Sequence, residues 1–445
     1  MNDIKTLETK LDSLDYATRK QAFDKLASMI ADGTIEVEAP TKETNVHFHT
    51  FFSYNGEGYS PMKIAYMAKK QGLGSVGIVD FDVLDAVDEF YEAAAALGLK
   101  ASAGMETRVF IPEFADKVIN SPGEPGISYH MGTGFPCGKV PASAQPLLCS
   151  LKQTAQDRNK AMVDRVNTYL EEVALDYEED VMPLTPSGNA TERHLCLAYA
   201  QKAESVFGDG SELADYWVGK LGESAKDTEL PCGASLQALI RSKTMKKGGV
   251  GYAKPDAGSF PKMAEVNEFI IDAGGIPTLT WLDGTNDGEK CIRELIDIAK
   301  QSGTAVINII PDRNFTAGLG EDDLKCKNLY EIIEIAGELG MPVIAGTEMN
   351  SPGLKFVDDF KSKELSPLIE PFWCGAMIVY AHSVLMRNAG IGYIGKWAEQ
   401  KFDDINAKNE FFVELGELLT PEKETLLKDI ASDVSPEQII DVLSN

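Results

Sequence analysis

The sequence of 445 residues contains no cysteine pattern that defines a disulfide-rich or zinc-ribbon protein, and no hydrophobic run long enough to be a clear membrane span. Its seven cysteines are scattered, odd in number and never spaced as Cys-X-X-Cys, which argues against a disulfide framework and a thiolate zinc site. The longest uncharged apolar stretch, 371–386, is shorter than the roughly 20 residues that span a bilayer, so it predicts a buried helix. The start of the chain is acidic and lacks a signal-peptide pattern. We therefore expect a cytoplasmic protein without a membrane partner.

Basic residues are also scarce. The chain has 42 Lys and Arg against 69 Asp and Glu, a formal net charge of −27. A field of this sign repels nucleic acid and anionic lipid, so any phosphate-bearing ligand must be small and bound by a local basic cluster. The content of 44% hydrophobic and 25% charged residues is typical of a globular protein, and the length predicts two or three domains or one large barrel with insertions.

Strand and helix patterns alternate in two separate parts of the chain. The alternation predicts parallel strands covered by helices in both parts. Between them, Gly/Pro-rich runs and helices without strands indicate an insertion. The predicted organisation is N-terminal helices 1–43, a first barrel part 44–111, an insertion or lid 112–261, a second barrel part 262–405 and an acidic helical tail 406–445.

The strongest sign of chemistry is a pair of histidines separated by one residue. The chain has only five histidines, and His47 and His49 lie together on a predicted strand. Residues two apart on a strand face the same side, with Cα atoms about 6.6 Å apart, so both rings can point at one metal ion. Taken alone, the pair is equally compatible with two core or surface histidines.

The residues that follow this pair narrow the interpretation. The segment NVHFHTFFSYNGEGYSP, the strand end Ile-Val-Asp80 and the strand end Ala-Gly-Met-Glu106 resemble the opening of the PHP (polymerase and histidinol phosphatase) family of metal-dependent phosphoesterases. The resemblance implies an α/β fold, a distorted (β/α)7 TIM-like barrel, here interrupted by the mostly helical insertion. It also implies up to three divalent metals at the C-terminal ends of the strands.

The resemblance assigns the metal ligands residue by residue. The first metal position takes His47, His49, Glu106 and Glu348. The second shares Glu106 and takes His130, while Trp281 replaces another usual histidine; Asp283 is an alternative ligand there or a simple turn residue.

The third metal position has lost its ligands, since Asn55, Phe81 and Asn350 stand where the family has acids and histidines. We therefore expect one tightly held Zn, Mn or Fe ion, at most a loosely held second, and no third.

The other candidate residues are predicted to bind a phosphate group of the substrate or to orient a metal ligand. Asp80 orients a ligand histidine or caps the following turn. Arg313, directly after a predicted strand, is placed to bind an anion and act in catalysis. The remaining candidates for substrate binding are cations, Arg193, Lys246 and Lys247.

These features predict a metal-dependent hydrolase that cleaves a small phosphorylated metabolite, a phosphomonoester or phosphodiester, with a metal-activated water. Two alternatives are a catalytically degenerate PHP-like protein that binds a metal or metabolite, and a single-metal hydrolase of carbon–nitrogen bonds.

Overall fold

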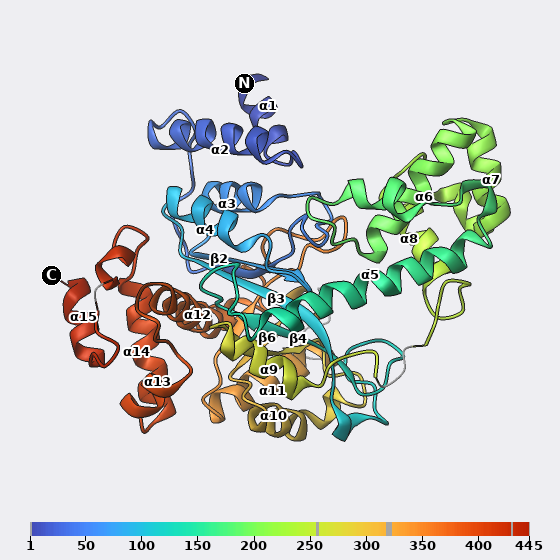
Figure 1. Ribbon diagram of the computed structural model, residues 1–445. Coiled ribbons are helices and arrows are strands. Elements are labelled where there is room, and N and C mark those ends of the chain that lie inside the picture. Colours follow the sequence, from blue (N-terminus) through green and yellow to red (C-terminus); the bar gives the residue numbers. More distant parts are fainter. Residues whose placement is uncertain (1, 255–257, 317–322, 429, 445) are drawn as a thin grey trace. The chain divides into compact units, whose positions relative to one another are not determined.

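The computed structural model describes residues 2–254, 258–316, 323–428 and 430–444. The chain forms two compact units, whose elements are labelled in Figure 1. The first, which we call the barrel unit, contains Met1–Thr50, Asn55–Leu147 and Phe260–Asn445; the second, the helical unit, contains Phe51–Tyr54 and Leu148–Ser259.

The barrel unit is built on one seven-stranded sheet in which the strands follow one another in sequence order. The strands are β1 (Thr44–Phe48), β2 (Ser75–Phe81), β3 (Ala101–Phe110), β4 (Ile127–Thr133), β5 (Ile276–Trp281), β6 (Val306–Ile309) and β7 (Val343–Ala345). Neighbours pair in parallel, except that β4 is antiparallel to both β3 and β5. A parallel bridge between Phe48 and Glu348, with a 2.8 Å hydrogen bond from the His49 N–H to the Glu348 carbonyl, joins the last segment to the first. The predicted distorted seven-stranded barrel is confirmed.

The assignment of strand β4 differs between sequence and structure, because the sequence analysis included its residues in an insertion spanning 112–261. It lies in the barrel sheet, and the helical unit takes up 148–259. The Gly/Pro-rich residues before β4 connect two antiparallel neighbours, so no crossover helix is required there. Without that helix the alternation that signals a parallel strand disappears from the sequence.

Helices cover the sheet, and their ends follow ordinary capping rules. Ser60 caps α3, accepting a hydrogen bond from the Lys63 N–H, and Pro61 is the first residue of the helix. The helices of the barrel unit are α1 (Asn2–Lys10), α2 (Tyr16–Ala31), α3 (Pro61–Lys70), α4 (Val87–Ala96), α9 (Met263–Asp272), α10 (Ile292–Gln301), α11 (Leu324–Glu338), α12 (Ile369–Ala389), α13 (Lys396–Lys401), α14 (Ile405–Leu418) and α15 (Pro436–Ser444).

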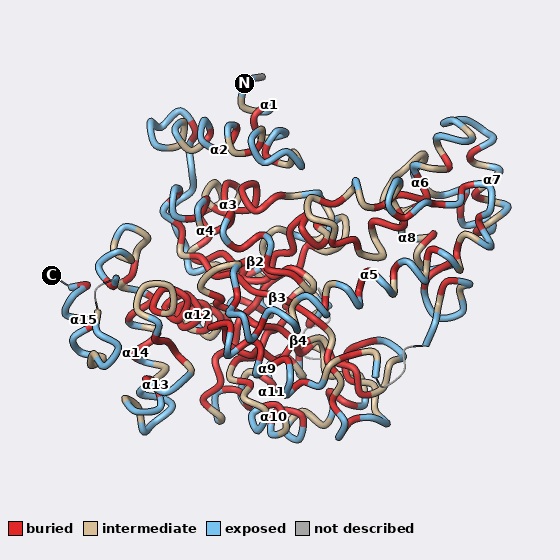
Figure 2. Tube along the Cα trace, viewed as in Figure 1, coloured by how far each residue is buried: buried red, intermediate tan, exposed pale blue. Residues whose placement is uncertain are grey.

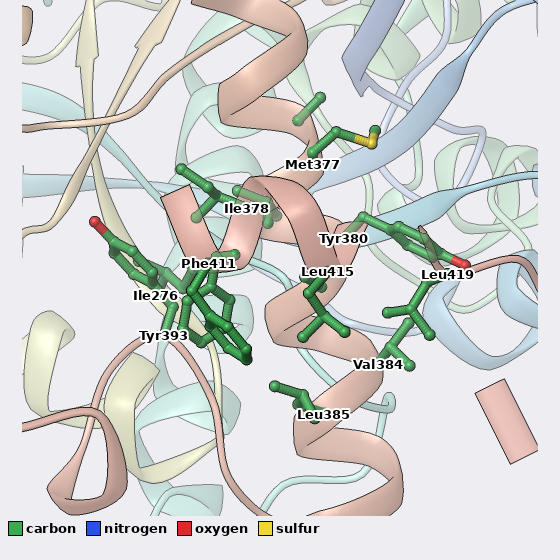
Figure 3. Close-up of a cluster of buried hydrophobic side chains, with 14 of the residues drawn as sticks. Ile276, Met377, Ile378, Tyr380, Val384, Leu385, Tyr393, Phe411, Leu415 and Leu419 are labelled. Carbon is green, nitrogen blue, oxygen red and sulfur yellow. The ribbon is translucent and has the colours of Figure 1, made fainter. Parts of the chain in front are cut away.

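Helix α12 is the centre of a large apolar cluster. It packs against α14 and β7, and Figure 3 shows its side chains Met377, Tyr380 and Leu385 beside Leu415 of α14. Segment Ser366–Ala389 is long and apolar enough to cross a membrane by composition, but 78% of its apolar window is buried inside the protein. Figure 2 shows the same helix as largely buried. The prediction of a buried helix from the apolar run is confirmed.

The helical unit has its own core. Its main helices are α5 (Gln145–Asn167), which begins in the barrel unit, α6 (Glu192–Phe207), α7 (Ser211–Leu221) and α8 (Ala234–Ile240). Trp217, Tyr199 and Leu195 are fully buried among them. A separate core explains why this segment forms a compact unit of its own.

Closure of the barrel requires glycine at position 346. A Cβ atom there lies 2.4 Å from Oδ1 of Asn45 and 2.6 Å from the backbone N of His47. We expect Gly346→Ala to lower the free energy of unfolding by about 1–3 kcal/mol, measured by urea denaturation, because backbone atoms cannot move aside cheaply. As a control, Gly337→Ala in α11, which meets nothing within 4 Å, should raise it by up to about 1 kcal/mol. Equal stability of the two variants would contradict this account of the closure.

Candidate metal centre

Three side chains from two strands converge at the C-terminal end of the barrel. His47 and His49 lie at the end of β1 and Glu106 lies on β3, and one ligand atom from each falls within 4.8 Å of the others. Oε2 of Glu106 is 3.3 Å from Nε2 of His49 and 3.7 Å from Nε2 of His47. The alternation of β1 directs both rings to the same side, as the spacing predicts.

Burial makes this group unusual. His47, His49 and Glu106 are at most 1% exposed, and Nε2 of His47 and Oε2 of Glu106 have no hydrogen-bond partner within the described residues. Buried polar atoms are normally paired, so such atoms pointing at one place need an explanation. Two imidazole nitrogens and a carboxylate oxygen form a donor set that suits a divalent ion such as zinc. The residues therefore fit the metal that the sequence predicts.

The electrostatics of the group agree with its geometry. Burial opposes protonation of His47, but the Glu106 carboxylate outweighs it and raises the pKa of His47. Burial likewise opposes ionisation of Glu106, but its two histidine neighbours hold the pKa of that carboxyl below its ordinary value. Glu106 is therefore an anion in this buried position, with the two imidazoles as its neighbours.

Two polar residues that the sequence analysis did not single out lie on the neighbouring strands. Asn308 of β6 pairs in register with Thr280 of β5, and both are buried. Their side chains have no hydrogen-bond partner in the part of the chain that is described. Asn308 also contributes, after Glu106 and Glu348, to raising the pKa of His47. The sequence feature that could have identified Asn308 is its polar amide within the otherwise apolar strand sequence VINII.

Asp80 fixes the segment that follows the ligand histidines. Its two carboxylate oxygens accept hydrogen bonds from Thr50, one from the N–H at 2.8 Å and one from the hydroxyl at 2.7 Å. The adjacent Phe81 stacks on His49 with ring centroids 4.4 Å apart. Asp80 thus acts on the metal group through the backbone after His49, while Phe81 packs where the family has a further ligand.

Glu348 follows the strand next to these residues, but its side chain forms an ion pair with Arg313. It is 5% exposed, and its Oε2 accepts a 2.7 Å charged hydrogen bond from Nη2 of Arg313. Arg313 follows β6 and Glu348 follows β7, so neighbouring strand ends bring the two together. Of the four predicted ligands of the first metal position, three form the buried group and Glu348 binds Arg313.

His130 requires a correction, because the structure does not bring it to the metal group. In the antiparallel pair of β3 and β4, Glu106 is opposite Met131, and directly opposed residues share a face. His130 is one residue further and faces away, where its Nε2 is 2.5 Å from Oδ1 of Asn267 on α9. Burial there lowers its pKa to about 4, so it is a neutral structural histidine.

The loop after β5 is organised around a buried glutamate. Glu289 accepts hydrogen bonds from the N–H groups of Leu282, Asp283 and Gly284, at 2.7–3.1 Å. Asp283 forms an ion pair with Lys325 at 2.8 Å, so its side chain is that of a turn residue with a cation partner. This pairing removes Asp283 as a substitute ligand in this arrangement.

Three of the basic residues predicted to bind phosphate, Arg193, Lys246 and Lys247, belong to the helical unit. Lys246 and Arg241 both contact Oε2 of Glu192, at 2.7 and 2.9 Å, and they lower the pKa of that partly buried carboxyl to about 2. Arg193 is half-buried next to Arg241, and Lys247 is exposed. Several cations therefore surround a single acid in an otherwise acidic protein.

Comparison with known proteins agrees with this geometry. The PHP domain family matches residues 45–208, which confirms the resemblance inferred from the sequence. No curated protein matches the chain. The PHP match and the His–His–Glu group together support a metal-dependent hydrolase that uses a divalent metal.

Two solved structures are similar to the chain. One is an amidohydrolase from Chromobacterium violaceum, with 15% identity over 74% of this chain and 96% of the other and a TM-score of 0.46. Another is a proposed metal-dependent phosphoesterase from Bifidobacterium adolescentis, with 18% identity over 75% and 98% and a TM-score of 0.46.

The position of His130 gives a direct test of the ligand set. His49→Gln should lower Zn²⁺ affinity by at least about tenfold, since it removes a ligand nitrogen. His130→Gln should keep the affinity of the folded protein within about threefold of wild type, because its ring faces α9. Isothermal titration calorimetry measures both. An equal loss in the two variants would return His130 to the metal centre.

Glu289 generates a pH dependence of stability. Burial raises its pKa from 4.5 to about 7, although three N–H groups oppose this shift. The folded protein then binds more protons than the unfolded chain between these pH values, so the free energy of unfolding should fall as pH rises from about 4.5 to about 7. Urea denaturation at pH 5 and pH 7.5 should show a smaller fall for Glu289→Gln than for wild type. Glu331→Gln, an exposed glutamate of α11, is the control and should keep the wild-type fall.

Proposed function

We propose that the protein is a cytoplasmic metal-dependent phosphoesterase that hydrolyses a small phosphorylated metabolite, a phosphomonoester or a phosphodiester. The observation that carries the proposal is the buried group of His47, His49 and Glu106, whose ligand atoms meet at the end of the barrel strands; those of His47 and Glu106 have no hydrogen-bond partner among the described residues. Active sites of α/β barrels form at this end. The resemblance to a family of phosphoesterases supports phosphorus chemistry over other hydrolysis.

In this proposal, some residues of the chain bind the metal ion and others keep those ligands in position. His47, His49 and Glu106 hold one divalent ion, Zn, Mn or Fe, and Asp80 keeps the segment after His49 in place through Thr50. When bound, such an ion supplies Lewis acidity toward a phosphoryl oxygen and lowers the pKa of a water. Burial around the group excludes bulk solvent, which strengthens each electrostatic interaction.

Arg313 is the residue proposed to bind the substrate anion in the barrel. One edge of its guanidinium is anchored by Glu348, while 46% of the side chain is exposed. A guanidinium that is anchored at Nη2 and has no other hydrogen-bond partner among the described residues suits bidentate binding of a phosphate. Glu348 is then a positioning residue for Arg313.

The cations of the helical unit support an anionic substrate. Lys246, Lys247 and Arg193 are proposed to bind the phosphate from a lid formed by the insertion. Lys246 now binds Glu192, an internal carboxylate with the charge and acceptor atoms of a small anion. Residues 51–54, directly after the ligand strand, belong to this same unit.

A second candidate is a single-metal hydrolase of carbon–nitrogen bonds. The small number of ligands favours this candidate, because three side chains are enough for one metal site. Phe81, which stacks on His49, stands at a position where the resemblance to the PHP family implies a further ligand. One open zinc position is sufficient for amide hydrolysis. A catalytically degenerate, metal-binding protein has the same ligand set without turnover.

Phosphate release from a panel of sugar phosphates, nucleotides and bis-p-nitrophenyl phosphate tests the proposal. Metal-stripped protein should be inactive and recover with Zn²⁺ or Mn²⁺. Glu106→Gln should lower kcat/KM by at least about a hundredfold, because it removes the ligand charge that holds the ion.

His130→Gln is the matched control and should retain activity per folded molecule, because its ring faces α9. Hydrolysis of amides but not phosphate esters would select the second candidate. Tight Zn²⁺ binding without turnover on either class would select the binding protein.

A further inference from the structure

An ion pair occupies the place where a fourth metal ligand is expected. Nη2 of Arg313 lies 2.7 Å from Oε2 of Glu348, and the Glu348 side chain is 7% exposed. A guanidinium has five N–H donors and no lone pair, so it satisfies a carboxylate as a cation does but cannot itself bind a metal. While this pair persists, the carboxylate has its positive partner without the metal.

The pair adjoins the segment that carries the metal ligands. The Glu348 carbonyl accepts a hydrogen bond from the N–H of His49, at 2.8 Å. The charge of Glu348 acts on His47, and Arg313 is stabilised by Glu348 and also by Glu106. The ion pair and the metal group therefore act on each other electrostatically, at a barrel end where a cation is favoured.

The backbone at Glu348 is fixed, so only its side chain can change partner. Glu348 and Met349 have φ values of 63° and 50°, two consecutive non-glycine residues in the left-handed region. Each such residue costs about 1–2 kcal/mol and is kept only where other contacts hold it. Here the carbonyls of Glu348 and Met349 accept hydrogen bonds from the N–H groups of His49 and Gly56. With the backbone held in this way, a change of partner by the Glu348 carboxylate would have to come from its side chain.

We propose that Arg313 is a resident cation that withholds Glu348 from the metal, so that the ion is held by His47, His49 and Glu106 alone and keeps an open position. The inference rests on the proposed metal centre. Removal of the guanidinium should release Glu348 as a fourth ligand and close that position. Arg313 thereby sets both the affinity and the coordination number of the centre.

The test compares three proteins by competitive Zn²⁺ titration and by the visible spectrum of the Co²⁺-loaded form. Arg313→Gln should bind Zn²⁺ at least about tenfold tighter than wild type, with a changed Co²⁺ spectrum, because a carboxylate joins the metal. The double variant Arg313→Gln/Glu348→Gln removes one charge of each sign and is charge-matched to wild type. It should return to within about threefold of the wild-type affinity and to the wild-type spectrum.

Arg293→Gln is the control for loss of an arginine–glutamate pair. Arg293 binds Glu338 at 2.9 Å on the surface of α10 and α11, and its removal should change neither the Zn²⁺ affinity nor the spectrum. A crystal structure of the zinc-loaded wild type tests the inference without a substitution. It should show Glu348 still paired with Arg313 and three protein ligands on zinc.

Two results would overturn the inference. One is a Co²⁺ spectrum of Arg313→Gln identical to that of wild type, which means that Glu348 does not move to the metal. The other is Glu348 bound to zinc in the wild-type crystal structure, with the double variant binding more than tenfold weaker. Both leave the metal centre intact. By contrast, wild-type protein that binds Zn²⁺ no better than His49→Gln contradicts the proposed function itself.

Discussion

The hydrogen bond from the His49 N–H to the Glu348 carbonyl is the contact on which the candidate site depends. It joins the end of β1 to the segment after β7 and so brings the first strand of the barrel to the last. Without this closure, His47 and His49 lie on an open sheet edge, far along the chain from Glu348 and Arg313. Gly346 permits the approach because a side chain there meets Asn45 and His47. The metal ligands and the cation beside them are thus products of one backbone junction.

The same junction leaves the barrel interior with polar groups that a stable apoprotein does not need. His47, Glu106, Thr280 and Asn308 present buried atoms with no hydrogen-bond partner among the residues that the structure describes. Each such atom costs about 1–3 kcal/mol relative to a satisfied one. A barrel selected for stability alone would fill this space with apolar side chains. The retained polar interior is explained by a bound ion that satisfies several of these atoms together.

The sequence predicted the parts of the site that follow from local periodicity. His47 and His49 are two residues apart on a strand, and the family motif fixed Glu106, so their convergence could be read without coordinates. The prediction that His130 is a metal ligand was wrong, because Met131, one residue further along β4, is the residue opposite Glu106. The orientation of β4 and its register with β3 depend on strand pairing, for which the local sequence has no signal. The Arg313–Glu348 pair joins residues of different loops and depends on the left-handed backbone at Glu348. Neither propensity nor motif predicts such a conformation for glutamate.

The charges of three side chains at the barrel end bear on the proposed binding of an anion by an acidic protein. Glu106 and Glu348 contribute two negative charges and Arg313 one positive charge, so these three side chains sum to minus one before a metal is bound. A divalent ion reverses this to positive by one, within a protein whose formal net charge is −27. Local fields inside a buried site outweigh distant surface charges that solvent screens. The sum over these three side chains and the ion is positive only because Arg313 is among them; with a neutral residue in its place, the same sum is zero. The proposed attraction of an anion is therefore conditional both on the ion and on Arg313.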